Sequence, residues 1–271
     1  MIDYGLSGKV AMVTAGGGAI CGEIASALAR EGVRVAVLDI SLEAANARAE
    51  AITSVGDAAC PVECDATDPA SVAKALDTVM EAWGTVDILV NGAGGGRKDC
   101  TTSTDLEFFD IDPEALASTI ALNYTSAVVP SQALGRVFAG KKSGVILNIS
   151  SIAGIRPLTR AVGYSNAKAA VNNFTQWLAV HMAREYSPQI RVNAVAPGFV
   201  LTRQNAFLLV DEATGEMTER GRRIVESVPM GRYGRPEEIV GAALWLVSDM
   251  SSFVTGAVVP VDGGFTAFSG V

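Results

Sequence analysis

Histidine is nearly absent from this sequence: His181 is the only one in 271 residues, and there are four cysteines. Cys60 and Cys64 lie close together, but no second ligand pair or histidine cluster accompanies them, as a zinc site would require. We therefore expect no bound metal.

A secretion signal and a membrane span are also missing. The start, from Met1 to Gly5, lacks the basic and apolar regions of a signal peptide, and no apolar run reaches membrane-spanning length. We expect no membrane partner, and we expect a reduced, cytoplasmic protein. Its thiols should be free, which applies to Cys21, Cys60, Cys64 and Cys100.

Positive charge is scarce as well, because the net charge is −8 and no cluster of lysines and arginines stands out. This argues against a nucleic-acid partner, so the predicted partner is a small polar molecule with a carbonyl or hydroxyl group. An acidic chain repels anions, so an acid substrate would need a locally cationic pocket.

The fold is predicted from short β-branched runs that alternate with longer amphipathic stretches. The predicted strands are Val10–Thr14, Val33–Asp39, Cys60–Cys64, Ile88–Asn91, Gly144–Ser150, Arg191–Ala196 and Ala257–Val261. The predicted helices are Ile20–Arg30, Leu42–Thr53, Pro69–Trp83, Pro113–Phe138, Tyr164–Arg184 and Pro236–Val247. Apolar strands separated by helices indicate an α/β protein with a parallel, seven-stranded, doubly wound sheet. No linker or repeat interrupts the chain, so we expect one Rossmann-type domain over residues 1–271.

Two long excursions break this alternation, Gly94–Asp112 and Phe199–Val228. Excursions at the carboxyl ends of strands are where substrate loops belong, and we expect them near 94–112 and 199–228. Surface insertions without a function are the alternative.

A glycine-rich turn follows the first predicted strand and precedes a helix. It consists of Thr14-Ala15-Gly16-Gly17-Gly18-Ala19-Ile20. Glycines let the backbone approach a ligand, and the free N–H groups of a helix N-terminus attract a pyrophosphate. A glycine turn alone is weak evidence.

A carboxylate ends the second predicted strand, about 20 residues beyond this turn. Asp39 would accept hydrogen bonds from the ribose hydroxyls of a dinucleotide and would repel a 2′-phosphate. The sequence therefore predicts NAD rather than NADP. A solvated acid near a helix N-terminus, without a ligand, is the alternative.

Tyr164 and Lys168 share one face of a predicted helix. A tyrosine that works as a base near neutrality needs its pKa lowered by ~2–3 units from about 10. A nearby ammonium and a positively charged nicotinamide ring would supply this. By itself this spacing is common, and a surface pair is the alternative.

Three other segments place polar residues at the carboxyl ends of predicted strands, where open α/β sheets bind ligands. Ser151 follows the fifth strand, Asn91-Gly92-Ala93-Gly94 closes the fourth, and Pro197-Gly198-Phe199-Val200-Leu201-Thr202 closes the sixth. Their joint occurrence with Tyr164 and Lys168 is highly specific. On these motifs the chain resembles the short-chain dehydrogenase/reductase family over nearly its whole length.

The resemblance implies a role for each matching residue. Tyr164 is the general acid/base, Ser151 polarises the substrate oxygen, and Lys168 binds the nicotinamide ribose. Asn123 holds a water that relays protons to Lys168. The implied cofactor-binding residues are Thr14, Gly16, Gly17, Gly18, Ala19, Ile20, Asp39, Asp65, Ala66, Asn91, Ala93, Gly94, Tyr164, Lys168, Pro197, Gly198, Val200 and Thr202. Among them, Asp65 and Ala66 would contact the adenine, and Thr202 the carboxamide.

The glycine turn departs from the family pattern. Ala15, Ala19 and Cys21 stand where the family usually has glycine. All three are small, so the resemblance still implies a pyrophosphate site, but which glycines touch the pyrophosphate stays open.

The segments around Phe174, Phe199 and the C-terminus resemble the D-mannonate oxidoreductase branch of the family. This implies NAD-dependent oxidation of D-mannonate to D-fructuronate, or the reverse. The predicted substrate residues are Arg97, Arg160, Arg203 and Asn205, with Arg160 as the first choice for gripping a carboxylate. Solvated or locally paired arginines are the alternative. A polyol or ketone dehydrogenase, or a non-catalytic NAD-binding regulator, also stays open.

Relatives in this family pair through long helices, which implies a homotetramer. Val171, Phe174, Trp177 and Leu178 would suit such an interface, but they equally suit burial within one subunit.

Overall fold

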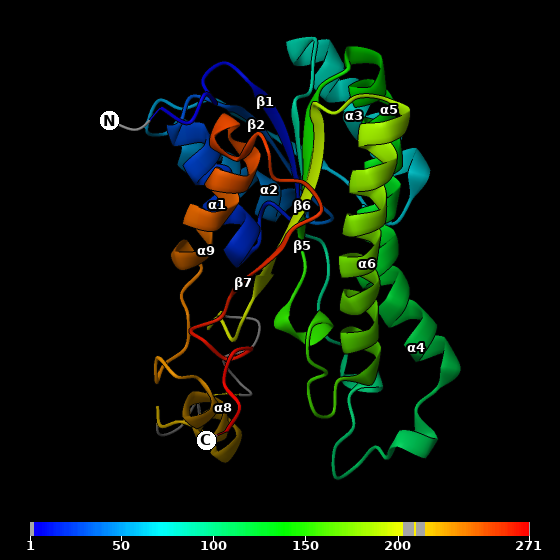
Figure 1. Cartoon of the computed structure of the whole chain (residues 1–271), viewed down its shortest axis with the longest axis vertical. Helices are drawn as coiled ribbons and strands as arrows, with labels where there is room; N and C mark the ends of the chain where they lie inside the picture. Colours follow the sequence, from blue (N-terminus) through cyan, green and yellow to red (C-terminus); the bar gives the residue numbers. More distant parts are fainter. Residues whose placement is uncertain (1–2, 203–208, 210–214, 271) are drawn as a thin grey trace.

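Seven parallel strands form one sheet in the order β3-β2-β1-β4-β5-β6-β7. Figure 1 labels β1, β2, β5, β6 and β7. The computed structural model describes residues 3–202, 209 and 215–270. The strands are β1 Val10–Thr14, β2 Arg34–Asp39, β3 Ala59–Glu63, β4 Ile88–Asn91, β5 Gly144–Ile149, β6 Ile190–Pro197 and β7 Val258–Val261. The predicted single-domain, doubly wound Rossmann fold is confirmed, and each predicted strand end lies within one residue of the observed one. The strand order reverses between β1 and β4, where such sheets bind ligands.

Helices cover both faces of the sheet. They are α1 Ala19–Arg30, α2 Leu42–Thr53, α3 Pro69–Trp83, α4 Pro113–Ile120, α5 Ser126–Lys141, α6 Val162–Glu185, α8 Glu219–Ser227 and α9 Glu237–Val247. Helices α1 and α9 pack against each other on one face, while α3, α5 and α6 form a layer on the other. No helix in the described part of the chain is both long enough and apolar enough to cross a bilayer.

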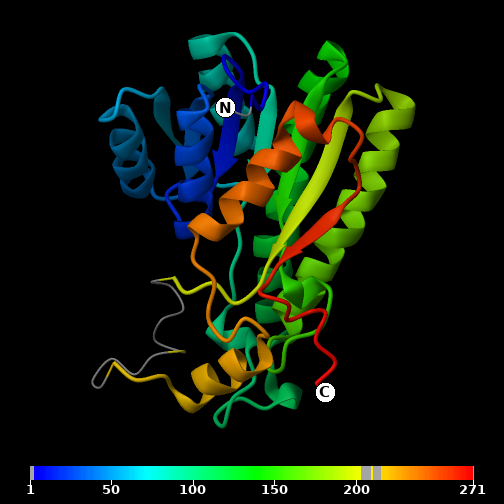
Figure 2. The same cartoon turned by 60° about the vertical axis from the view of Figure 1, so that its left-hand side comes forward.

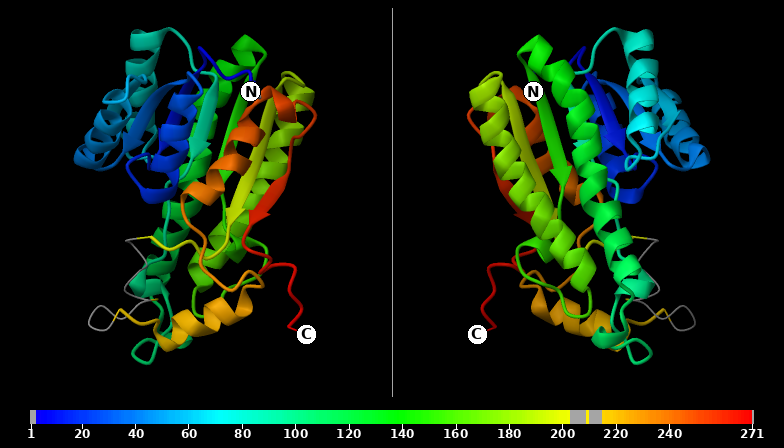
Figure 3. Two further views of the ribbon diagram at one scale, coloured as in Figure 1. Left: turned by 90° about the vertical axis from the view of Figure 1, so that its left-hand side faces the viewer. Right: turned by 90° about the vertical axis from the view of Figure 1, so that its right-hand side faces the viewer.

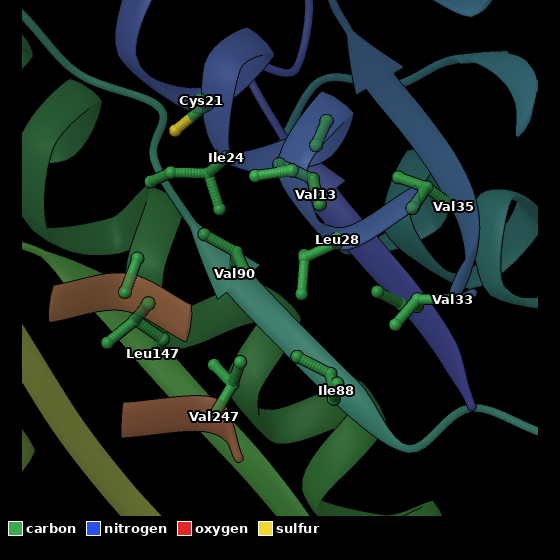
Figure 4. Packing of buried hydrophobic residues seen from close by; sticks show 14 of the residues in the cluster. Val13, Cys21, Ile24, Leu28, Val33, Val35, Ile88, Val90, Leu147 and Val247 are labelled. Carbon is green, nitrogen blue, oxygen red and sulfur yellow. The ribbon is translucent and has the colours of Figure 1, made fainter. Parts of the chain in front are cut away.

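Each face of the sheet has its own apolar core. Alternate residues of β1 face opposite sides, so Val13 packs in one core and Met12 in the other. Figure 4 shows the first core, in which Ile24 and Leu28 of α1 meet Val90 of β4. Burial on both sides explains why the central strands are apolar throughout rather than alternating.

The predicted helix Pro113–Phe138 is interrupted. Helix α4 ends at Ile120, a π-helical turn occupies Ala121–Thr125, and α5 then begins. The prediction of one continuous helix was wrong because it rested on apolar spacing, which does not register an extra residue in a turn. Such turns are frequent at functional sites, and this one contains Asn123.

Helix α8 was not among the predicted helices. It lies within the excursion at 199–228, and its sequence is dominated by charge, so apolar spacing gave no signal. The side chain of Thr218 caps it by accepting a hydrogen bond from Gly221 N. Helix α8 and the segment 94–112 lie together beyond the carboxyl ends of the strands (Figures 2 and 3).

Candidate active site

Tyr164, Ser151 and Lys168 come together at the carboxyl end of β5. Ser151 follows this strand, and α6 carries Tyr164 and Lys168 in its first two turns. The ammonium of Lys168 donates to the carbonyl of Ile149 at 2.9 Å and lies 5.8 Å from the centre of the Tyr164 ring. The Ser151 hydroxyl accepts from Ala153 N at 3.1 Å and hydrogen-bonds the Tyr164 side chain.

The titration of Tyr164 differs from the expected direction. Burial raises the pKa of Tyr164 above its usual value, and the hydrogen bond with Ser151 opposes this without reversing it. Burial also lowers the pKa of Lys168 to about 8. Because loss of hydration outweighs the neighbouring groups, the expected lowering of the tyrosine pKa is not achieved by the chain alone.

Asn123 fastens the loop after β4 to the π-helical turn. Its Oδ1 accepts from Gly95 N at 2.9 Å, and its Nδ2 donates to the carbonyls of Gly95 and Thr119 at 2.8 and 2.9 Å. The side-chain amide is thus committed to backbone partners, and its role in holding a relay water stays a prediction. A Cβ on Gly94 would lie 2.5 Å from Asn123 Oδ1 and 3.2 Å from Lys168 Nζ, so only glycine fits here.

The N-terminus of α1 is left open to an anion. Gly18 is its N-cap residue, no side chain caps it, and its first turn holds no acidic residue. Side chains do cap α2, α3, α4 and α8. The amides at the start of α1 therefore suit the pyrophosphate of a nicotinamide dinucleotide.

The glycines of the turn have different environments. A Cβ on Gly16 would lie 2.9 Å from the carbonyl oxygen of Val13, and one on Gly17 would lie 2.6 Å from Cβ of Ala44. These two glycines are needed for packing within the chain, whereas Gly18 and Ala19 are exposed. Ala15 has a φ of +51°, so it occupies the left-handed region that favours glycine.

Two carboxylates predicted to bind the adenosine are held by local hydrogen bonds. Asp39 is half-buried at the end of β2 and accepts from Gly17 N at 3.2 Å and Ser41 N at 3.0 Å. Asp65 accepts from the amide and hydroxyl of Thr67 at 2.8 and 2.7 Å, and Ala66 beside it is buried. The position of Asp39 at the end of β2 fits a ribose, as predicted from its spacing.

Thr14 and Asn91 hold the ends of β1 and β4 through hydrogen bonds within the chain. Thr14 Oγ1 accepts from Gly92 N at 2.9 Å and so ties β1 to the end of β4. Asn91 is 3% exposed, and its Nδ2 donates to Ser131 Oγ and Asn148 Oδ1, both at 2.9 Å. Their contacts with the cofactor stay a prediction.

The segment after β6 closes against the last strand and its loop. Gly198 N donates to the carbonyl of Val261 at 2.9 Å, and a Cβ on Gly198 would lie 2.6 Å from Cα of Asp262. Val200 is buried and pairs with Gly234, and Ala93 receives a hydrogen bond from Ser126 Oγ at 3.0 Å. Pro197 ends β6, and the described part of the segment continues to Thr202.

A cavity of about 590 Å³ lies next to the loop that precedes α6, and Arg160 and Arg220 are among its lining residues. Arg220, on α8, was missed from the sequence because it stood in a segment without a predicted element. Arg97 lies elsewhere: it is exposed and forms a two-point ion pair with Asp99 at 2.6 and 3.0 Å. Arg203 and Asn205 fall outside the described residues.

The described residues contain no group of three or more His, Cys, Asp or Glu that could hold a metal ion. All four cysteines are free thiols. The polar groups brought together at the site are those of Tyr164, Ser151 and Lys168.

Comparisons with known proteins show the family of this chain. Residues 15–266 match the model of the family described as Enoyl-(Acyl carrier protein) reductase. The uncharacterized oxidoreductase UxuB of Bacillus subtilis is 42% identical, and the match covers 98% of each chain.

Two solved structures are similar over nearly the whole chain. One, from Haemophilus influenza, is described provisionally as a D-mannonate oxidoreductase with bound NAD; it is 39% identical over 98% of both chains, with a TM-score of 0.91. Another, from Beutenbergia cavernae, is described provisionally as an NAD(P)-dependent gluconate 5-dehydrogenase with bound NADP; it is 30% identical over 98% of this chain and 100% of that one, with a TM-score of 0.85. Sequence, fold and site thus agree, and this chain belongs to the short-chain dehydrogenase/reductase family of NAD(P)-dependent oxidoreductases that act on CH–OH groups.

Proposed function

We propose that this protein transfers a hydride between NAD and a sugar acid, with D-mannonate and D-fructuronate as the substrate pair. The observation that carries the proposal is Arg160, whose guanidinium lines the cavity beside the start of α6, four residues before Tyr164. No described residue forms an ion pair with it, so it is available to grip a carboxylate. Likeness to the Haemophilus influenza structure supports the same substrate class.

The proposed chemistry assigns one task to each polar group of the site. When bound, the nicotinamide accepts or supplies the hydride and, in its oxidised form, carries a positive charge. Tyr164 takes the proton of the substrate hydroxyl as the phenolate during oxidation, and as the neutral phenol it gives a proton to the substrate oxygen during reduction. Ser151 donates a hydrogen bond to the same substrate oxygen, and Lys168 anchors the ribose. The Lys168 ammonium lies 5.8 Å from the centre of the Tyr164 ring, so its charge would favour the phenolate.

NAD is proposed over NADP because of Asp39. Its carboxylate ends β2 and is oriented by two backbone N–H groups, so it would repel a 2′-phosphate at this position. The predicted contacts of Thr202 with the carboxamide and of Asp65 and Ala66 with the adenine belong to the same proposal.

Assembly as a homotetramer is also proposed, but fewer of the residues predicted from the sequence support it. Val171 and Leu178 are buried within the subunit, and Phe174 packs against the same core, so these three do not argue for an interface. Trp177 and Val180 on α6 are 58% and 60% exposed and would suit one. Sedimentation of the purified protein tests this, and a monomer would contradict it.

The substrate is tested by steady-state kinetics with D-mannonate and D-mannitol, each with NAD and with NADP. D-mannitol is the matched neutral compound because a hydroxymethyl group replaces the carboxylate. We expect kcat/KM to be highest for D-mannonate with NAD. Turnover only of neutral polyols or apolar ketones would contradict the proposal, and equal use of NADP would contradict its cofactor part.

A further inference from the structure

The cavity next to the loop that precedes α6 combines apolar walls with charged groups, among them Arg223 and Glu219, which pair with each other. Phe199 and Phe265 meet edge to face, with ring centres 5.3 Å apart, and Leu158 also lines the space. Arg160 and Arg220 line the same cavity. An apolar pocket with a few convergent charged groups is the usual form of a small-molecule site.

Arg220 has no partner for its charge among the described residues. It is half-buried on α8, and no described residue forms a hydrogen bond or an ion pair with its guanidinium. The other arginines of the helix do have partners: Arg222 donates to the carbonyl of Met217 at 2.9 Å, and Arg223 to Glu219 at 2.5 Å. Burial, and secondly the charge of Arg160, lower the pKa of Arg220, so the two guanidinium groups are close enough to repel each other.

Arg160 is held in place by its backbone rather than by an acid. Its φ is +72°, in the left-handed region that a side chain disfavours. Its carbonyl accepts a hydrogen bond from Thr102 N at 2.9 Å, which ties it to the excursion at 94–112. Strained backbone at a ligand site persists where the surroundings enforce it, and here it brings a guanidinium to the cavity that also receives Arg220.

We infer that Arg160 and Arg220 together form the site for the carboxylate of the substrate, and that α8 therefore selects acids over neutral polyols. The inference rests on the proposed function, because the carboxylate is that of the proposed sugar acid. Glu219 lines the same cavity but pairs with Arg223, so the like charges of Arg160 and Arg220 are unfavourable until an anion binds. A carboxylate has two oxygens, and each planar guanidinium fork can donate to it.

Two excursions of the chain thus build one site. The segment at 94–112 holds Arg160 through Thr102, and the segment at 199–228 supplies Arg220 on α8. With the carboxylate between the two arginines, the remainder of the substrate chain must extend toward Tyr164, which follows Arg160 by four residues in the sequence.

The test compares Arg220→Ala and Arg220→Lys with Arg222→Ala, a matched control on the same helix that does not line the cavity. The dissociation constant of D-mannonate is measured by calorimetry in the presence of NADH, with which it cannot react, and KM is measured for D-mannonate and D-mannitol with NAD. We expect Arg220→Ala to weaken D-mannonate about 10- to 100-fold and to leave D-mannitol unchanged. Arg220→Lys keeps the charge but loses the planar guanidinium fork, so its affinity for D-mannonate should lie between those of Arg220→Ala and the wild type. Arg222→Ala should match the wild type.

Failure of this inference is distinct from failure of the proposed function. If D-mannonate binds the wild type and Arg220→Ala equally well, the carboxylate site is refuted while the function stands. If the wild type does not bind D-mannonate, the substrate is refuted, and inorganic phosphate becomes the probe of the same variants. Phosphate binding that Arg220→Ala abolishes would retain the two-arginine anion site for another acid, and no phosphate binding to the wild type would refute it.

Discussion

The thiol of Cys21 occupies the space that a side chain on Gly92 would need. A Cβ built on Gly92 would lie 1.9 Å from Cys21 Sγ, although the two residues belong to α1 and to the loop after β4. Burial raises the pKa of this thiol to about 12, so it remains protonated and acts as a small apolar group. Cys21 stands where the family usually has glycine, and its thiol faces Gly92. The departure from the family pattern at position 21 is therefore linked to the glycine at position 92.

The first prediction is that these two positions are coupled in stability. Gly92→Ala should lower the free energy of unfolding by about 1–3 kcal/mol, because the thiol cannot retreat from the close-packed core. Adding Cys21→Ala should restore about 1 kcal/mol or more of this loss. Reversible urea unfolding of the single and double variants measures the coupling.

Gly96→Ala is the control for that cycle, since nothing lies within 4 Å of a Cβ at this position. It should change the free energy of unfolding by less than about 0.5 kcal/mol. Additive effects of the Gly92 and Cys21 substitutions would contradict the coupling.

The second prediction concerns Ala15, whose φ of +51° is costly for any residue with a side chain. Ala15→Gly should raise the free energy of unfolding by up to about 1 kcal/mol, net of the greater freedom of glycine in the unfolded chain. Ala19 lies in the first turn of α1 and lacks this strain, so Ala19→Gly should lower the free energy of unfolding. Thermal unfolding of both variants gives the comparison, and a loss of stability in Ala15→Gly would speak against strain at this residue.

Tyr164 and Ser151 carry the third prediction. Tyr164→Phe should lower kcat about 10²–10⁴-fold and leave the dissociation constant of NAD nearly unchanged. Oxidation requires the phenolate, and burial raises the pKa of Tyr164, so kcat/KM for oxidation should increase with pH above neutrality. Ser151→Ala removes the hydrogen bond that lowers this pKa, so its oxidation profile should shift to higher pH. Full activity in Tyr164→Phe would disprove the mechanism.

The fourth prediction follows from burial of the Lys168 ammonium, which lowers its pKa from 10.5 to about 8. Between these two values the unfolded chain holds a proton that the folded chain has lost, so the free energy of unfolding should increase with pH. Lys168→Met lacks this contribution. The wild type should therefore gain about 3 kcal/mol relative to the variant between pH 7 and about 10.5. Urea unfolding at a series of pH values measures the gain.

Lys74→Met, on the exposed side of α3, is the control for this series and should follow the pH dependence of the wild type. A constant difference between the wild type and Lys168→Met across the pH range would show that the lysine is hydrated in the folded state.

Asp39 gives the fifth prediction. Asp39→Asn keeps the shape of the side chain but removes the charge that repels a 2′-phosphate. The KM for NAD should rise about 10-fold, because hydrogen bonds to a charged acceptor are lost, and kcat/KM with NADP should rise. Asp68→Asn is the control, because Asp68 caps α3. It should change neither the KM for NAD nor kcat/KM with NADP. An unaltered NAD to NADP ratio in Asp39→Asn would place cofactor selection elsewhere.

The sequence predicted the sheet well because the central strands are buried on both faces and read as unbroken apolar runs. It also predicted that Ser151, Tyr164 and Lys168 meet, because the carboxyl ends of parallel strands share one edge. The π-helical turn at Ala121–Thr125 and helix α8 were not predicted. The first depends on tertiary contacts of Asn123, and the second has too little apolar surface to show in the sequence.

The directions of individual side chains were the least predictable part of the site. Asn91 turns into a buried network with Ser131 and Asn148, and Arg97 pairs with Asp99 two residues away. Nothing in the sequence except its charge marked Arg220 as a residue of the site. Each of these outcomes depends on neighbours from other elements or on a local turn, which strand and helix periodicity does not encode.

The π-helical turn also limits which changes in chain length this protein can accept. An α-helix advances about 100° per residue, so one extra residue rotates everything after it by roughly that angle. Helix α4 can thus face α6 while α5 faces α3, within one helical stretch. Deleting a single residue between Thr119 and Ser126 would turn Phe138 away from its core and withdraw Asn123 from Gly95, so the count of residues there is as constrained as their identity.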